Sequence, residues 1–134
     1  PISCQVICGF DASFGAGLLD ALGQVVVDRQ PTLLIAYDSE YPEPLHAKRD
    51  TPDCGGVALL LTPERSARSL ARIDVSPSPA LAETLPDRDL ESLRQQIPAL
   101  RSLPLLQMLA RGEAGQVCLD YLPPMQLSVD LKPC

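Results

Sequence analysis

One segment of the chain, from Asp11 to Glu64, constrains the fold most, because it places an amphipathic helix before two apolar strands. Apolar residues recur at helical spacing from Ser13 onward, with polar residues on the opposite side. Two apolar runs follow, Thr32 to Tyr37 and Val57 to Thr62. A near-continuous apolar run is typical of a strand covered on both faces. The segment therefore predicts an α/β layered fold, with a mixed, mostly parallel sheet and packed helices.

The first turns of the expected helix carry three small residues, Gly15, Ala16 and Gly17. Glycine costs a helix about 1 kcal/mol relative to alanine. We therefore expect close packing against this backbone by a neighbouring helix or another subunit. Asp11 or Ser13 is suited to cap the first amides of the helix.

Size and charge limit the classes of function. The 134 residues, 46% of them hydrophobic, fit a single domain spanning 1–134 with its own core. A formal net charge of −6 argues against nucleic acid or an anionic membrane as the main ligand. Uninterrupted apolar runs last only a few residues, against the roughly 20 that a spanning helix needs. We expect a soluble cytoplasmic protein.

The cysteines do not form a metal-binding pattern. They lack the paired short spacings of a zinc site, and the chain has one histidine, His46, in a polar loop. We therefore expect no metal site and reduced thiols. The carboxylates that follow the first apolar run are interpreted as an exposed acidic turn. The cysteines are Cys4, Cys8, Cys54, Cys118 and Cys134, and the carboxylates are Asp38, Glu40 and Glu43.

Outside the central segment the patterns are shorter. Alternation predicts a strand at Ile2 to Ile7, and the spacing of Arg65, Arg68 and Arg72 places them on one face of a helical turn. Further along, the sequence predicts one strand, then two short helices, then two more strands. The helices are Asp87 to Ile97 and Leu105 to Arg111, and the strands are Ile73 to Val75, Val117 to Tyr121 and Gln126 to Leu131.

The string DASFGAGLLDAL, followed by TLLIAYDSEYPEPL and then GGVALLL, resembles the small β-ketoacyl synthase-like family, relatives of the N-terminal domain of condensing enzymes and of chain-length factors. The resemblance covers residues 1–64, and residues 65–134 form an extension. It implies a partial thiolase-like fold and a helix that starts at the nucleophile position. It also implies a role in fatty-acid or polyketide-type assembly on an acyl carrier protein, with no cofactor.

The catalytic residues of the family do not carry over. Condensing enzymes place a nucleophilic cysteine at the sharp turn where the helix begins, and here Asp11 or Ala12 takes that place. Cys8 is the nearest thiol and lies about three residues too early. The decarboxylating step needs two histidines, and only His46 is present. A complete condensing site cannot be built, and whether the chain is an enzyme stays open.

The leading hypothesis is a non-catalytic, chain-length-factor-like subunit that pairs with an active condensing enzyme, with acyl chains accommodated near Phe14 and Leu18. One alternative is an active acyl-transfer or condensing enzyme with Cys8 as nucleophile. Another is a stand-alone α/β domain that binds a small molecule. Because 134 residues are too few for both halves of a thiolase-like fold, we expect a homo- or hetero-oligomer.

Overall fold

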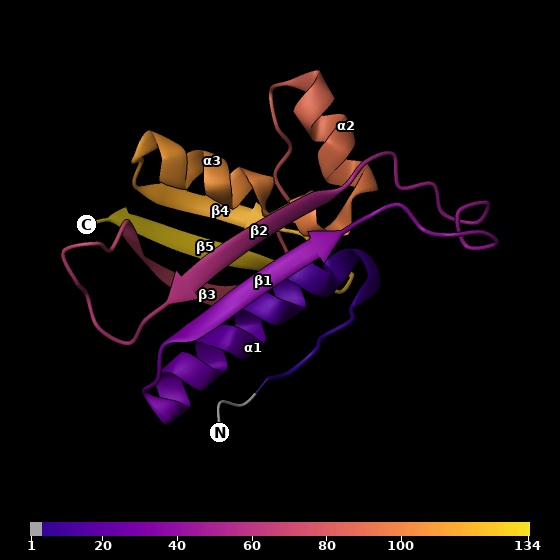
Figure 1. The fold of residues 1–134 in the computed structure, drawn as a ribbon. Coiled ribbons are helices and arrows are strands. Elements are labelled where there is room, and N and C mark those ends of the chain that lie inside the picture. Colours follow the sequence, from indigo (N-terminus) through magenta and orange to yellow (C-terminus); the bar gives the residue numbers. More distant parts are fainter. Residues whose placement is uncertain (1–3) are drawn as a thin grey trace.

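A computed structural model describes residues 4–134, and Figure 1 shows their arrangement. Two small sheets are accompanied by three α-helices and two short 3-10 helices. In chain order the elements are η1 (Phe10–Ala12), α1 (Ser13–Asp28), β1 (Thr32–Asp38), β2 (Gly55–Leu61), β3 (Ala71–Ser78), α2 (Arg88–Gln96), η2 (Pro98–Ser102), α3 (Leu103–Arg111), β4 (Gly115–Leu119) and β5 (Gln126–Pro133).

The sheets correct the predicted fold class. β1 pairs with β2, and β5 lies between β3 and β4; every pairing is antiparallel. The mostly parallel sheet of a thiolase-like layered fold is therefore wrong. The apolar run Thr32 to Tyr37 is typical of a parallel strand covered on both faces, but only one of its faces is partly buried. In the structure its residues alternate between partly buried and exposed positions, as in a sheet with one open face.

Helix α1 forms as its apolar periodicity predicts. Phe14, Leu18, Ala21 and Val25 are buried along one side, at spacings of four and three residues. The helix packs against β1 and η2, and Figure 1 shows it running alongside β1. It ends at Arg29, which takes the left-handed conformation with a φ of 57°.

The small residues of α1 do meet a close neighbour, but it is neither a helix nor another subunit. A Cβ at Gly15 would lie 2.7 Å from the carbonyl oxygen of Asp120, just after β4. A Cβ at Gly17 would lie 3.0 Å from Cδ1 of Leu34 on β1. The bare start of α1 therefore lets the helix approach both sheets.

The expected caps of α1 are absent. No side chain caps the helix at Ala12, and Asp11 instead pairs with Arg49. The Ser13 hydroxyl accepts a hydrogen bond from the Gly9 amide (3.0 Å) and donates one to the carbonyl of Phe10 (2.6 Å). These side chains therefore stabilise the turn before the helix and do not accept hydrogen bonds from the first amides of the helix.

The second half of the chain follows the sequence prediction closely. α2, α3, β4 and β5 form within a few residues of the expected bounds, and the Asp87 carboxylate caps α2 by accepting from the amides of Asp89 and Leu90. The helical turn expected at Arg65, Arg68 and Arg72 is wrong, because the first two lie in the loop after β2 and the third lies on β3. The expected N-terminal strand falls partly outside the described residues, and its residues 4–7 have no regular secondary structure.

The core lies where α1 and α3 meet the three-stranded sheet. Its fully buried side chains come from α1, α3, β4 and β5, and the inner faces of β1, β2 and β3 pack around them. β5 supplies the largest share, because it is the middle strand of its sheet. The buried cluster is Phe14, Leu18, Leu105, Val117, Leu119, Leu127, Val129 and Leu131.

One helical segment, Phe10–Asp28, is apolar and long enough to cross a membrane by length and composition alone. Polar residues such as Asp20 and Gln24 keep its uninterrupted apolar runs short. Its mean hydropathy is nevertheless 1.2, so the length of such runs does not by itself exclude a spanning helix. A core helix or a signal sequence passes the same test. The cytoplasmic location stays a prediction.

Candidate functional site

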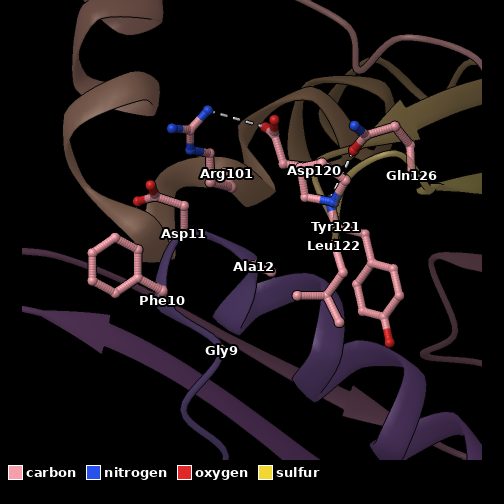
Figure 2. A pocket seen from close by; sticks show the side chains of 10 residues that line it. Gly9, Phe10, Asp11, Ala12, Arg101, Asp120, Tyr121, Leu122 and Gln126 are labelled. Atoms are coloured by element: carbon pink, nitrogen blue, oxygen red, sulfur yellow. Dashed lines mark hydrogen bonds and ion pairs between the residues drawn. The ribbon is translucent and has the colours of Figure 1, made fainter.

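A cavity of about 370 Å³ opens at the start of α1, where the family resemblance places the nucleophile (Figure 2). One wall is the turn into the helix and the other is the connection from β4 to β5, with Arg101 of η2 closing one side. The lining residues are Gly9, Phe10, Asp11, Ala12, Arg101, Asp120, Tyr121, Leu122, Pro123 and Gln126.

The turn into the helix is strained at Phe10. This residue has a φ of 57°, a conformation that bulky side chains rarely adopt, and 72% of its surface is exposed. The guanidinium of Arg49 lies 4.5 Å from the centroid of its ring, close enough for a cation–π contact. Strained backbone conformations are concentrated at functional sites, so this turn is a candidate functional site.

Neither residue at the nucleophile position is a cysteine. Asp11 is ion-paired with Arg49, and Ala12 is buried and has no functional group. None of the residues lining the described cavity is a cysteine, serine or histidine. Cys8 is exposed and does not line the cavity. The cavity therefore holds no thiol at the nucleophile position, and its titratable lining residues are Asp11, Arg101, Asp120 and Tyr121.

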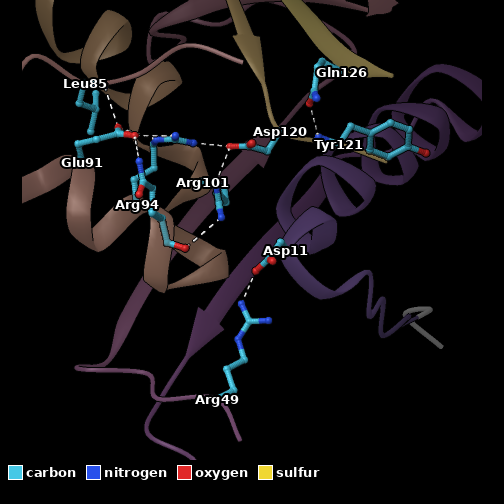
Figure 3. Close-up of polar contacts among 10 residues, drawn as sticks. Asp11, Arg49, Leu85, Glu91, Arg94, Arg101, Asp120, Tyr121 and Gln126 are labelled. Carbon is cyan, nitrogen blue, oxygen red and sulfur yellow. Dashed lines mark hydrogen bonds and ion pairs between the residues drawn. The ribbon is translucent and has the colours of Figure 1, made fainter. Parts of the chain in front are cut away.

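A network of charged side chains holds the far wall of the cavity (Figure 3). Arg94 lies at its centre, with 4% of its surface exposed, and it donates to both Glu91 oxygens at 2.8 Å and to Asp120. Arg101 donates to the same Asp120 carboxylate at 3.3 Å. Asp120 lines the cavity, so the network fixes the position of one carboxylate in the cavity wall.

The network shifts the pKa values of two of its members. Hydrogen bonds from Arg94 hold the pKa of Glu91 at about 2, below its ordinary 4.5, although burial opposes the shift. The amide of Leu85 also donates to Glu91, at 2.9 Å. The hydrogen bond with Glu91 in turn raises the pKa of Arg94. Both groups therefore stay charged at neutral pH.

The other residues singled out in the sequence lie away from this cavity. Phe14 and Leu18 are fully buried in the core and line neither it nor the larger groove described below, so their acyl-binding role stays a prediction. His46 lies in the loop between β1 and β2, 3.9 Å from Asp50. Asp38 accepts a hydrogen bond from the Ala99 amide at 2.6 Å, so it fixes η2.

The remaining turn carboxylates, Glu40 and Glu43, are exposed. Across residues 4–134, no three His, Cys, Asp or Glu side chains come together in a way that could hold a metal ion.

Sequence reasoning missed the charged network. Glu91 and Arg94 lie three residues apart in a predicted helix, a spacing that would have indicated their pairing. Asp120 and Arg101 carried no such signal, because their contact joins residues 19 positions apart through the fold.

No family model matches the chain, and comparison with curated proteins and with solved structures finds no match.

Proposed function

We propose that the protein is a non-catalytic, chain-length-factor-like subunit that binds an active condensing enzyme in fatty-acid or polyketide-type biosynthesis. The sequence resemblance over residues 1–64 suggests the pathway. The thiolase-like fold that the resemblance implies is excluded by the antiparallel sheets and is not part of the proposal. An acyl carrier protein is the second expected partner.

The observation that carries the proposal is an uncovered apolar face on the β1–β2 sheet. Leu33 and Ile35 of β1 are each 58% exposed, and Tyr37 is more exposed still. The antiparallel register sets Leu33 opposite Leu60 and Ile35 opposite Ala58. Side chains directly opposite one another lie on the same face of a sheet, so these residues form one continuous patch.

This outer face is of the kind that partner proteins cover. Contiguous exposed apolar patches are uncommon on monomeric proteins and mark interaction surfaces. The cavity at the start of α1 supports the non-catalytic part, because Asp11 is ion-paired with Arg49 and none of the lining residues is a cysteine, serine or histidine. A subunit that binds without reacting is consistent with both features.

The test is affinity purification of the full-length protein from its native host, with mass spectrometry of the co-eluting proteins. Stoichiometric recovery of a condensing enzyme or an acyl carrier protein is the expected result. Recovery of the protein alone would contradict the proposal and favour a stand-alone domain. Light scattering on the same sample checks the expected oligomer, which a clean monomer would contradict.

The enzyme alternative is tested separately with Cys8→Ala. Because Cys8 is exposed and lies outside the cavity, we expect the variant to fold and to recover the same partners. Loss of an acyl-transfer activity in a folded Cys8→Ala protein would overturn the non-catalytic assignment.

A further inference from the structure

A second, larger groove, of about 940 Å³, lies away from the start of α1. It is bordered by the C-terminal half of α1, by β2 and β3, by α3 and by the chain after β5. Its apolar lining comes partly from the inner faces of the two strands, including Leu59, Leu61 and Ile73. Leu105 and Leu109 of α3 also contribute. We refer to it as the β2–β3 groove.

Positive charge is concentrated around the β2–β3 groove. Five of the chain's 11 Lys and Arg residues line it, against two carboxylates, Glu64 and Asp74, although the whole chain has a net charge of −6. Within the described residues, Arg29, Arg65 and Arg68 make no ion pair. An apolar groove with unpaired cations around it is complementary to a ligand that is both apolar and anionic.

The strands that border the groove each have one unpaired edge. Among residues 4–134, β2 pairs only with β1, and β3 pairs only with β5. Residues 58–61 of β2 and 71–74 of β3 all line the groove, so both strands run along it. An unpaired edge presents backbone N–H and C=O groups that an extended peptide can pair with.

We propose that the β2–β3 groove binds an extended acidic segment of a partner protein. The segment adds as a strand along the unpaired edges of β2 and β3. Its apolar side chains pack toward Leu61 and Ile73, and its carboxylates pair with Arg65 and Arg68. This site shares Ala58 and Leu60 of β2 with the outer face of the β1–β2 sheet. It does not include Leu33, Ile35 or Tyr37 of β1, so the response of the β1 residues distinguishes the two proposals.

The probe is an eight-residue peptide that alternates Glu and Val, with a Lys and Val peptide of the same length as its control. Amide resonances of the labelled protein are followed during titration, and calorimetry gives the Kd. The acidic peptide should perturb residues 58–74. Raising the salt from about 50 to about 500 mM should weaken its binding, because the charges are exposed to solvent.

Charge-reversal variants locate the site. The double variant Arg65→Glu, Arg68→Glu should raise the Kd of the acidic peptide at least about tenfold, which corresponds to about 1.4 kcal/mol of binding free energy. Arg88→Glu is the matched control, because Arg88 is exposed on α2 and lies outside the groove. It should leave the Kd unchanged. If the double variant loses its dispersed spectrum, the pair Arg65→Gln and Arg68→Gln replaces it.

Four results would overturn the proposal. The first is that the Lys and Val peptide binds equally well. The second is that the acidic peptide perturbs Leu33, Ile35 and Tyr37 of β1 instead of the groove. The third is that neither peptide binds. Finally, sodium dodecanoate or anionic phospholipid vesicles could perturb residues 58–74 while the peptide does not, which would assign the groove to an amphiphile or a membrane surface.

Discussion

The two sheets of this protein differ in how fully the chain covers them. In the three-stranded sheet, consecutive residues of β4 and β5 are buried, so both faces of these strands are covered. In the two-stranded sheet, burial alternates strictly, and the outer face carries Leu33, Ile35 and Leu60 in the open. The strands of both sheets carry apolar residues. The apolar content of a strand therefore does not show whether its own chain covers both of its faces.

The largest expected difference between the sheets is the cost of truncating a leucine. Leu127→Ala on β5 should lower the free energy of unfolding by about 2–5 kcal/mol, because the side chain is fully buried in the core. Leu60→Ala on β2 should change it by less than about 0.5 kcal/mol, because the side chain is 67% exposed. Urea denaturation of both variants measures the contrast. Equal costs would show that the isolated chain already covers the outer face.

Gly15 and Gly17, two of the three glycines of α1, test the same contrast from the helix. Gly15→Ala should cost about 1–3 kcal/mol, because the new Cβ would lie 2.7 Å from a backbone carbonyl oxygen that cannot move freely. Gly17→Ala meets only the end of the Leu34 side chain, at 3.0 Å. Its gain in helix propensity, up to about 1 kcal/mol, should offset that contact. Thermal unfolding of the pair distinguishes them, and a harmless Gly15→Ala would contradict the close approach to Asp120.

The charged network beside the three-stranded sheet predicts a dependence on pH. The pKa of Glu91 is lower in the folded protein than its ordinary 4.5, so its contribution to stability is complete above pH 4.5 and is lost as the pH falls toward about 2. Glu91→Gln removes this contribution. Wild type should therefore lose stability faster than the variant between those pH values, in urea denaturation at stepped pH. Parallel curves would show that Glu91 is not held by Arg94.

The smallest expected effect on stability is at the centre of the outer face. Ile35→Ser should leave the free energy of unfolding within about 0.5 kcal/mol of wild type, because Ile35 is largely exposed. The variant should instead reduce self-association at high concentration, since it interrupts the apolar patch. Sedimentation velocity measures this property. A strongly destabilised variant would place Ile35 in the core.

Much of the local structure could be predicted from the sequence. The helical period of α1 identified its buried side, and the alternation of β4 and β5 located both strands. The parallel sheet was wrong because Thr32 to Tyr37 has apolar residues on both faces whether or not both are covered. Period alone cannot distinguish a strand covered by its own chain from one left for a partner.

The candidate site was predictable only in part. The family resemblance pointed to Asp11 and Ala12, and the structure places both in the cavity lining. It could not reveal that Arg49 neutralises Asp11, because that contact joins residues 38 positions apart. Asp120 was missed for the same reason, since Arg94 and Arg101 reach it only once the chain has folded.

The central claim is that a partner protein covers the outer face of the β1–β2 sheet. The most direct test is co-purification from the native host with Ile35→Lys, beside the control Leu81→Lys, whose side chain is 88% exposed in a loop. We predict that Ile35→Lys remains folded and loses a stoichiometric condensing-enzyme partner, while Leu81→Lys retains it. Retention of the partner by a folded Ile35→Lys protein would contradict the account.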